Sequence, residues 1–306
     1  MSDQKTISKA GLFHLAVVYF VWGSTYLAIR IGVRSGSGFP PFTFAGLRVL
    51  TAGILLLLIG KLRGRSILPT GRDVGILAAS GFLLWIGGNG LVTWAETQVD
   101  SAIAALIVAA VPIWVAGMEA QLDRRIPGAR MIISLLVGFA GILVLSMPVL
   151  RSGVRADLVS VLALFLASLS WGGGLVLQAR QPVSVSRGVS SGYQQIFGGI
   201  FFALLVILVG EPQPTPQPQA WAAWGYLVVF GSVFAFTSFI SALQLLPTHL
   251  VVTYAYVNPV IAVFLGWLLL SEPITLWTAA GALLVFLGVA GVYRGERHLQ
   301  RSRRNE

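Results

Sequence analysis

The sequence predicts an all-α membrane protein in which ten transmembrane helices form two inverted five-helix repeats. Of its 306 residues 56% are hydrophobic and only 10% are charged, whereas a soluble domain carries about 25% charged residues. The charged residues lie in short segments between apolar runs that reach roughly the 20 residues needed to cross a bilayer. A soluble enzyme with a large core therefore fits poorly.

Ten apolar runs separated by short loops are the expected spans. The first follows Lys5 and Lys9 and is too long for a cleaved signal, with no Ala-x-Ala site behind it. The loop at 211–219 has alternating prolines, which favour extended polyproline and forbid a helix. In chain order the spans cover residues 12–33, 42–60, 74–94, 101–121, 130–149, 157–178, 190–210, 221–244, 249–270 and 274–293.

The distribution of basic residues predicts the orientation. With the N-terminus inside, most of the 21 lysines and arginines fall in inside loops or in the basic C-terminal tail. Cytoplasmic loops carry such an excess, so we expect both termini in the cytoplasm. The net charge of +10 thus indicates membrane topology and anionic lipid near the tail, not nucleic acid.

Three motif pairs recur at a spacing close to 150 residues, which indicates duplication of a five-helix unit. Because five is odd, the second unit enters the membrane from the other side, as in secondary transporters that bind substrate near the midplane. The expected repeats cover residues 1–150 and 151–306, the second with the basic tail. The pairs are Trp22-Gly23-Ser24 with Trp171-Gly172-Gly173, Pro112 with Pro259, and Gly138-x-x-Gly141 with Gly288-x-x-Gly291.

Motifs along nearly the whole chain resemble the EamA family of the drug/metabolite transporter superfamily. They are Trp22-Gly23-Ser24-Thr25-Tyr26, Ile29-Arg30-Ile31-Gly32, Pro41 and Arg48 before Ala52-Gly53, Gly88-Asn89-Gly90 before Ala95-Glu96, Ala104-Ala105 through Pro112, Ser170-Trp171-Gly172, and Tyr254-Ala255-Tyr256-Val257-Asn258-Pro259-Val260 followed by Glu272. The resemblance implies two EamA units in an inner membrane and export of a metabolite or amino acid. It also implies that helices 1–4 and 6–9 surround a cavity, with 5 and 10 to one side. Asp123-Arg124-Arg125 departs from the family's acidic-basic pair, which we interpret as a difference in topology.

Aromatic and amide side chains within spans are the candidate substrate contacts. Trp22 and Trp171 lie away from the interfacial belt where Trp is usual, and their ring faces could meet aromatic, apolar or cationic groups; packing inherited from the repeat is the alternative. Trp85 and Asn89 lie four apart on one side of span 3, where an interhelical hydrogen bond is the alternative. Tyr254, Tyr256 and Asn258 precede the proline of span 9.

Further residues are candidates for coupling transport to a gradient, for gating and for helix kinks. Arg48 within span 2 could face the cavity and favour anionic substrates, or could snorkel or pair with Glu96. Glu96, on the face of Trp85, is a candidate coupling carboxylate or a solvated interfacial one. Gln178 and Gln244 are gate candidates or plain helix ends, and Pro112 and Pro259 are the expected helix kinks.

The sequence shows no catalytic motif and no phosphate-binding glycine loop. It has no cysteine and three scattered histidines, so we expect no metal, no cofactor and no enzymatic activity. The expected function is an inner-membrane secondary transporter, a monomer or homodimer, that exports a small metabolite such as an amino acid or amphipathic compound by alternating access. The alternatives are a carrier or exchanger of anionic metabolites such as sugar phosphates, and a membrane enzyme or scaffold that does not transport.

Overall fold

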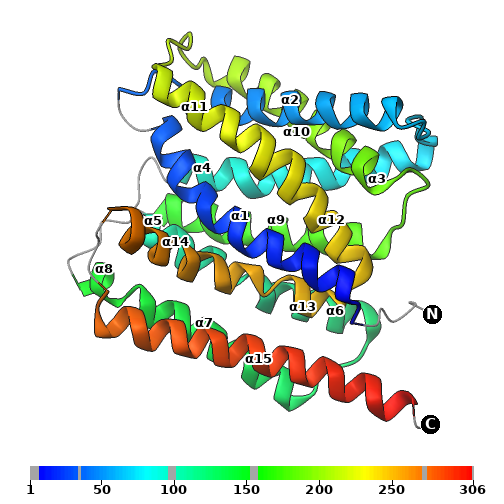
Figure 1. The fold of residues 1–306 in the computed structure, drawn as a ribbon, viewed down its shortest axis with the longest axis vertical. Coiled ribbons are helices and arrows are strands. Elements are labelled where there is room, and N and C mark those ends of the chain that lie inside the picture. The colour runs from blue at the N-terminus through cyan, green and yellow to red at the C-terminus, as the bar shows by residue number, and fades with distance from the viewer. Residues whose placement is uncertain (1–6, 34–35, 96–100, 152–157, 271–273, 305–306) are drawn as a thin grey trace.

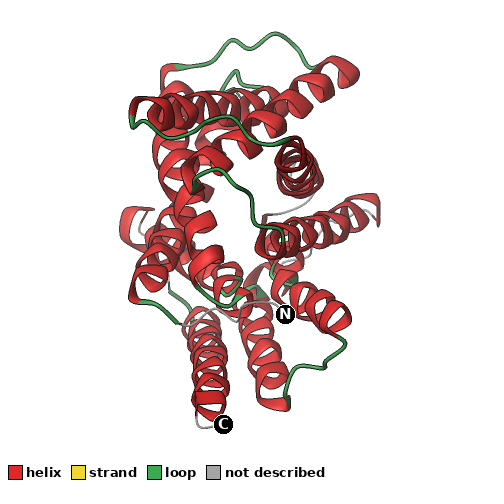
Figure 2. Cartoon of the chain, turned by 90° about the vertical axis from the view of Figure 1, so that its right-hand side faces the viewer, coloured by secondary structure: helices red, strands yellow, loops and turns green. Residues whose placement is uncertain are grey.

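The computed structural model describes residues 7–33, 36–95, 101–151, 158–270 and 274–304. These ranges contain helices and connecting loops and no strand (Figures 1 and 2). The helices are α1 (Lys9–Val33), α2 (Pro41–Leu62), α3 (Gly71–Gly81), η1 (Phe82–Gly90), α4 (Leu91–Ala95), α5 (Ser101–Val108), α6 (Val111–Asp123), α7 (Ala129–Leu145), α8 (Met147–Arg151), α9 (Leu158–Arg180), α10 (Arg187–Val209), α11 (Pro218–Tyr226), η2 (Leu227–Ala235), α12 (Phe236–Leu245), α13 (Thr248–Val251), α14 (Tyr254–Leu270) and α15 (Leu276–Arg304).

The expected membrane spans correspond closely to these helices. Eight described helices or helix series are long and apolar enough to cross a bilayer, and α7 is a shorter apolar helix. Four spans are composite: α3-η1-α4, α5-α6, α11-η2-α12 and α13-α14. The last span was expected to end near residue 293, but α15 continues to Arg304. Residues 294–304 contain no proline and many strong helix formers, so nothing local stops the helix.

Contacts between loops and helix ends define two ends of the bundle. At one, the backbone N–H and the hydroxyl of Ser184, after α9, donate to the carboxylate of Asp73 in α3. At the same end, Nδ1 of His14 in α1 lies 3.2 Å from the hydroxyl of Ser238 in α12. At the other, the backbone N–H of Thr215 donates to Gly38 O at 2.8 Å, and Glu211 accepts from the N–H groups of Phe42 and Thr43. We call the first the basic end, because Lys9, Lys61, Arg72, Arg124, Arg125, Arg180 and Arg187 lie there, and the second the opposite end.

The two halves of the chain are inverted with respect to each other. At the basic end α1 and α3 begin whereas their counterparts α9 and α12 end, and α6 ends whereas its counterpart α13 begins. Both ends of the described chain lie on this face (Figures 1 and 2). This inversion is what a repeat unit with an odd number of helices requires, because the second copy then enters the membrane from the other side.

The helices α7 and α15 pack against each other at one side of the bundle (Figure 1), as the resemblance implied. Their contact is close because glycines face each other. A Cβ on Gly288 would lie 2.5 Å from the nitrogen of Gly138, and one on Gly141 would lie 2.6 Å from the nitrogen of Val285. The two Gly-x-x-Gly motifs thus join helices within one chain.

Two π-helical segments occupy matching places in the halves. Each is nine residues long, η1 in the third span and η2 in the eighth. A π-helical turn is rare and is frequently found at functional sites. From the sequence both segments were expected to be regular α-helix.

The helix interruption lies directly before the proline in the first half, but not in the second. In the first half the turn at Ala109–Ala110 directly precedes Pro112, which occupies the start of α6. In the second half the turn is at Val252–Thr253, whereas Pro259 lies inside α14. The Thr253 hydroxyl donates to Leu250 O at 2.6 Å, and such a local bond competes with the helical ladder. The second half is therefore interrupted six residues before Pro259, and Pro259 itself, the expected kink, lies inside α14.

The close packing of α7 on α15 predicts the effect of one added methyl group. Gly288→Ala should lower the apparent Tm in detergent, because overpacking at a backbone contact costs about 1–3 kcal/mol. Gly225→Ala in α11 is the matched control, since no atom lies within 4 Å of its Cβ position. Equal Tm values for the two variants in differential scanning fluorimetry would contradict this packing.

Candidate functional site

Six aromatic side chains meet near the middle of the bundle, and we call them the central aromatic cluster. The ring of Trp22 lies 5.1 Å from that of Tyr254, 6.1 Å from Trp171 and 5.0 Å from Phe239. Aromatic edges and faces attract at these separations. The members come from α1, η1, α9, α12 and α14, and so from both halves: Trp22, Trp85, Trp171, Phe236, Phe239 and Tyr254.

Hydrogen bonds connect this cluster across the two halves. Trp22 Nε1 donates to the carbonyl of Gly231 in η2 at 3.0 Å, and Trp171 Nε1 donates to the hydroxyl of Tyr254. The Asn258 amide nitrogen donates to the carbonyls of Tyr19 and Tyr254, each at 3.2 Å, which joins α14 to α1. Trp22 and Tyr254 are buried, while Trp171 is half-buried, so the cluster keeps one accessible member.

Not all the aromatic and amide candidates meet here. Tyr256 is fully buried and points to α7, where its hydroxyl donates to Leu135 O at 3.0 Å and its ring lies against Gly138. Trp85 belongs to the cluster, at 5.1 Å from Phe236 and 6.5 Å from Trp171. Asn89 lies one turn further along η1 and is half-buried.

Arg48 is buried inside α2 beside the cluster. Its Nε donates to the hydroxyl of Ser232 in η2 at 2.8 Å, and its guanidinium carbon lies 5.8 Å from the centre of the Trp85 ring. It neither snorkels nor forms an ion pair with the described residues. Glu96, its expected partner, lies outside the described residues.

The two gate candidates are part of polar contacts near the basic end. Gln178 in α9 accepts from the amide of Gln194 in α10, which also donates to Ser80 in α3 at 2.8 Å. Gln244 in α12 accepts from Arg187 Nε at 2.7 Å. Each glutamine therefore joins helices from different parts of the bundle instead of simply ending a helix.

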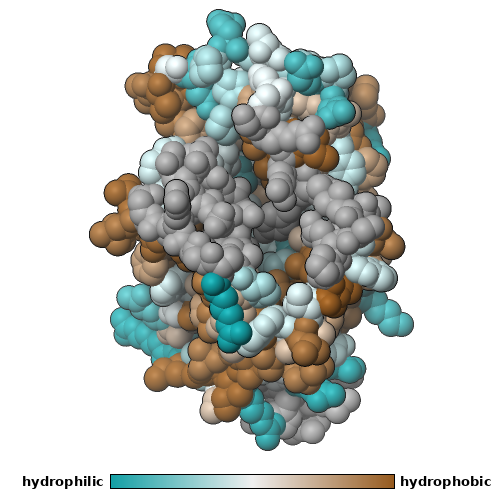
Figure 3. All heavy atoms as spheres, turned by 90° about the vertical axis from the view of Figure 1, so that its left-hand side faces the viewer, coloured by the Kyte–Doolittle hydropathy of each residue, from teal (hydrophilic) through white to brown (hydrophobic). Residues whose placement is uncertain are grey.

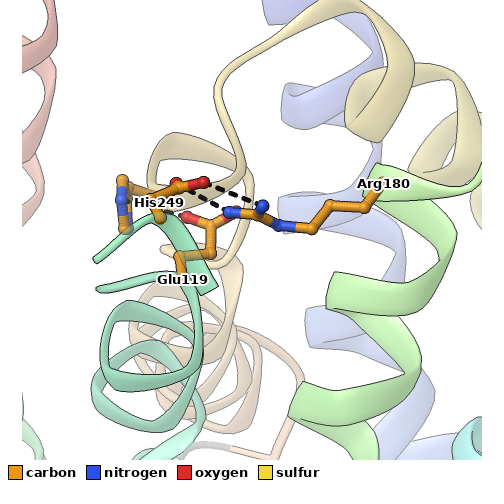
Figure 4. A network of polar contacts seen from close by, with 4 residues as sticks. Glu119, Arg180 and His249 are labelled. Atoms are coloured by element: carbon orange, nitrogen blue, oxygen red, sulfur yellow. Dashed lines mark hydrogen bonds and ion pairs between the residues drawn. The ribbon is translucent and has the colours of Figure 1, made fainter. Parts of the chain in front are cut away.

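Two ion pairs join three helices at this end, and the sequence analysis did not find them. Arg180 of α9 binds both carboxylate oxygens of Asp123 at 2.9 and 2.7 Å. His249 Nε2 of α13 lies 3.0 Å from Glu119 of α6, and Figure 4 shows Arg180 reaching toward this pair. The partners are far apart in sequence, and no local spacing reveals them. Only the concentration of charge at helix ends could have suggested such contacts.

Figure 3 views the opposite end, where apolar side chains of the described residues gather toward the edges of the face. The described residues contain no group of three or more His, Asp or Glu side chains that could hold a metal ion. The arrangement thus offers an aromatic site with few charges, and ion pairs bridge helices at the basic end.

A family model described as "EamA-like transporter family" matches residues 9–147 and 158–294. An uncharacterized inner membrane transporter, YedA, of Escherichia coli (strain K12) is 35% identical over 285 residues, which cover 91% of this chain and 90% of that protein. An uncharacterized transporter, YoaV, of Bacillus subtilis (strain 168) is 24% identical over 274 residues, 89% of this chain and 92% of that protein.

A solved crystal structure has the same fold. It superimposes with a TM-score of 0.80 at 22% sequence identity, and the match covers 96% of this chain and 99% of the other. At this identity the likeness establishes the arrangement of helices and carries no conclusion about substrate.

The ion pair between Asp123 and Arg180 predicts a small coupling energy. Because the Asp123 side chain is 46% exposed, a double-mutant cycle with Asp123→Asn and Arg180→Gln should give about 0.2–1 kcal/mol. Added salt should reduce this value through screening. The hydrogen bond from Arg72 to the neutral Gln181 is the control, whose cycle with Arg72→Gln and Gln181→Ala should respond less to salt. Thermal unfolding in detergent measures both coupling energies. A coupling between Asp123 and Arg180 that does not change with salt would contradict the assignment of this contact as an ion pair.

Proposed function

Because the chain belongs to the EamA-like transporter family, we propose that it is an inner-membrane secondary transporter and not an enzyme. It would export a small metabolite, such as an amino acid or another amphipathic compound. The family match and the transporter names of its relatives support transport. The inner-membrane location follows YedA, which is named an inner membrane transporter. The excess of lysine and arginine at the basic end supports a cytoplasmic position for this end and for both termini.

The observation that carries the proposal is the central aromatic cluster. It takes side chains from both inverted halves, and it lies deep in the bundle, where inverted-repeat transporters bind substrate. Its rings suit an apolar or aromatic group. The Trp171 indole and Tyr254 hydroxyl add polar atoms at the half-buried side of the cluster.

The mechanism we propose is alternating access between the two ends. The structure supports a state closed at the basic end, because Asp123–Arg180, Glu119–His249 and Arg187–Gln244 bridge helices there. The opposite end, where no ion pair joins described residues, is the expected entrance or exit. Substrate or proton gradients would supply the energy. The two halves, 1–150 and 151–306, would rock about the central cluster so that one end opens as the other closes.

Two tyrosines provide a matched test of the site. Tyr254→Phe and Tyr256→Phe each delete one hydroxyl group, but only Tyr254 belongs to the central aromatic cluster. In proteoliposomes with a panel of labelled amino acids, Tyr254→Phe should raise KM or lower counterflow several-fold. Tyr256→Phe should keep its transport and lose about 1 kcal/mol of stability with its buried hydrogen bond. If Tyr256→Phe impaired transport and Tyr254→Phe did not, the site would lie elsewhere. If the wild type transported no compound of the panel, this would count against the proposed substrate class.

The absence of cysteine from the sequence permits a direct test of the gate. Glu119→Cys with His249→Cys places thiols on α6 and α13, whose native side chains are 3.0 Å apart. A short bifunctional thiol cross-linker should hold the basic end closed and abolish flux, and cleavage of the link should restore it. A pair beside the flank, Arg151→Cys in α8 with Trp277→Cys in α15, whose native guanidinium carbon and ring centre lie 4.4 Å apart, should tolerate the same treatment. Full flux after complete cross-linking of the first pair would contradict the gate.

A carrier of anionic metabolites is the second candidate, and the buried Arg48 is the observation that favours it.

A further inference from the structure

We propose that Arg48 binds the carboxylate of a substrate whose apolar part lies on the central aromatic cluster. This inference rests on the proposed transport function and names the chemical class of the substrate: a small monocarboxylate with an aromatic or apolar body.

Arg48 carries its charge deep into the membrane span. It is seven residues beyond Pro41, the first residue of α2, which corresponds to roughly 10 Å along the helix. Its side chain is 6% exposed. An arginine at such depth is costly unless it meets an opposite charge, and it is a candidate functional group for that reason.

The described contacts of Arg48 do not neutralise its charge. Its hydrogen bond to the described residues is the one from Nε to Ser232, a neutral hydroxyl. The ring of Trp85 lies 5.8 Å from the guanidinium carbon, and a cation–π contact provides a partial attraction without a counter-charge. The two ion pairs among the described residues are both at the basic end. The two terminal nitrogens of the guanidinium are thus donors that the described residues leave unused, and they are available to an anion.

A carboxylate at the start of the same helix is already used. Glu211, in the loop after α10, accepts from the backbone N–H groups of Phe42 and Thr43 at 2.9 and 2.7 Å and from the Thr43 hydroxyl at 2.8 Å. It thereby caps the start of α2, more than a turn before Arg48. A negative charge at a helix N-terminus is stabilised there, so this carboxylate has a structural role.

A second side chain beside Arg48 has a buried donor without an acceptor. Trp85 is 2% exposed, and its Nε1 has no hydrogen-bond partner among the described residues. A buried N–H without an acceptor is uncommon and costs about 1–3 kcal/mol. The terminal guanidinium nitrogens of Arg48 and Nε1 of Trp85 are thus neighbouring donors that the described residues do not use, which points to a ligand with acceptor oxygens.

The surroundings favour a carboxylate over a phosphate. One guanidinium offers a single positive charge, which matches a carboxylate in charge and in planar bidentate geometry. A phosphate dianion or a sugar would need further cations or many donors. The neighbours of Trp85 are instead the aromatic rings of Phe236 at 5.1 Å and Trp171 at 6.5 Å, which suit an apolar body.

The test compares three probes with the same nine carbons: 3-phenylpropanoate, 3-phenylpropan-1-ol and 3-phenylpropylamine. They are titrated against the purified full chain in lipid nanodiscs, with tryptophan fluorescence as the readout. We expect the wild type to bind the carboxylate at least tenfold more tightly than the alcohol or the amine. Equal binding of the three would overturn the proposal. Preferential binding of phenyl phosphate over 3-phenylpropanoate would overturn the choice of carboxylate.

Variants assign the preference to Arg48. Arg48→Gln should abolish the preference for 3-phenylpropanoate and leave alcohol binding unchanged, whereas Arg48→Lys should retain part of it. Arg72→Gln, at the basic end, is the control and should behave as the wild type. A preference that persists in a folded Arg48→Gln variant would overturn the proposal. If Arg48→Gln fails to fold, the probe comparison in the wild type and in Arg48→Lys still decides.

Flux measurements separate this inference from the proposed function. Proteoliposomes that accumulate a labelled monocarboxylate, with loss in Arg48→Gln, support both. Saturable flux of neutral or cationic compounds that is insensitive to Arg48→Gln supports transport and overturns the Arg48 site. Charge-selective binding without flux of any compound in the panel supports the site and counts against transport.

Discussion

The hydrogen bond from Trp22 in α1 to the carbonyl of Gly231 in η2 joins the two halves of the chain deep in the membrane. In the hydrocarbon core no water can satisfy a polar group, so each one needs a partner inside the bundle. In the π-helical segment η2 the carbonyl of Gly231 accepts from Trp22, and the hydroxyl of Ser232 accepts from Arg48. This short segment therefore fixes the positions of both the aromatic and the charged parts of the candidate site.

The polar groups divide into those that hold the bundle and those with unused donors. Asn258, Gln178 and Gln244 each bridge two helices, and Glu211 caps α2. Arg48 and Trp85 retain donors that the described residues do not use. The ion pairs at the basic end are partly exposed and individually weak, which suits contacts that must break in a transport cycle.

Much of the fold could be predicted from the sequence, because apolar run length and basic loops are direct consequences of the bilayer. The spans and the inverted halves follow from the apolar runs, from Lys and Arg placement and from the recurring motif pairs, whereas the flanking position of α7 and α15 was implied by the family resemblance. The π-helical segments could not be predicted, since η1 and η2 have the composition of ordinary apolar helix. At the interruption at Val252–Thr253, the Thr253 hydroxyl donates to Leu250 O and also contacts the hydroxyl of Tyr19. The contact with Tyr19 is tertiary, so the sequence around Pro259 does not reveal it.

The candidate site was predictable in part. Trp22, Trp171 and Tyr254 could be selected because they lie within spans and near the repeat motifs, and the structure brings them together. Phe236 and Phe239 could not be distinguished from other core phenylalanines. Tyr256 shares its motif with Tyr254, yet two positions along a helix turn its ring by about 200°, so that it faces α7. The pairing of His249 with Glu119 needed the three-dimensional structure, because 130 positions separate them in the chain.

The central claim is that the two ends open alternately around the aromatic cluster, and the most direct test measures both ends in one experiment. Spin labels in the cysteine-free chain would report one distance between the two halves at the basic end, with Arg125→Cys and Pro182→Cys. They would report a second distance between the halves at the opposite end, with Trp94→Cys and Ile274→Cys. Double electron–electron resonance would follow each distance in nanodiscs with and without a transported compound. The account predicts that the two distances shift in opposite directions. Distances that both stay fixed, or that both lengthen together, while flux remains saturable would contradict it.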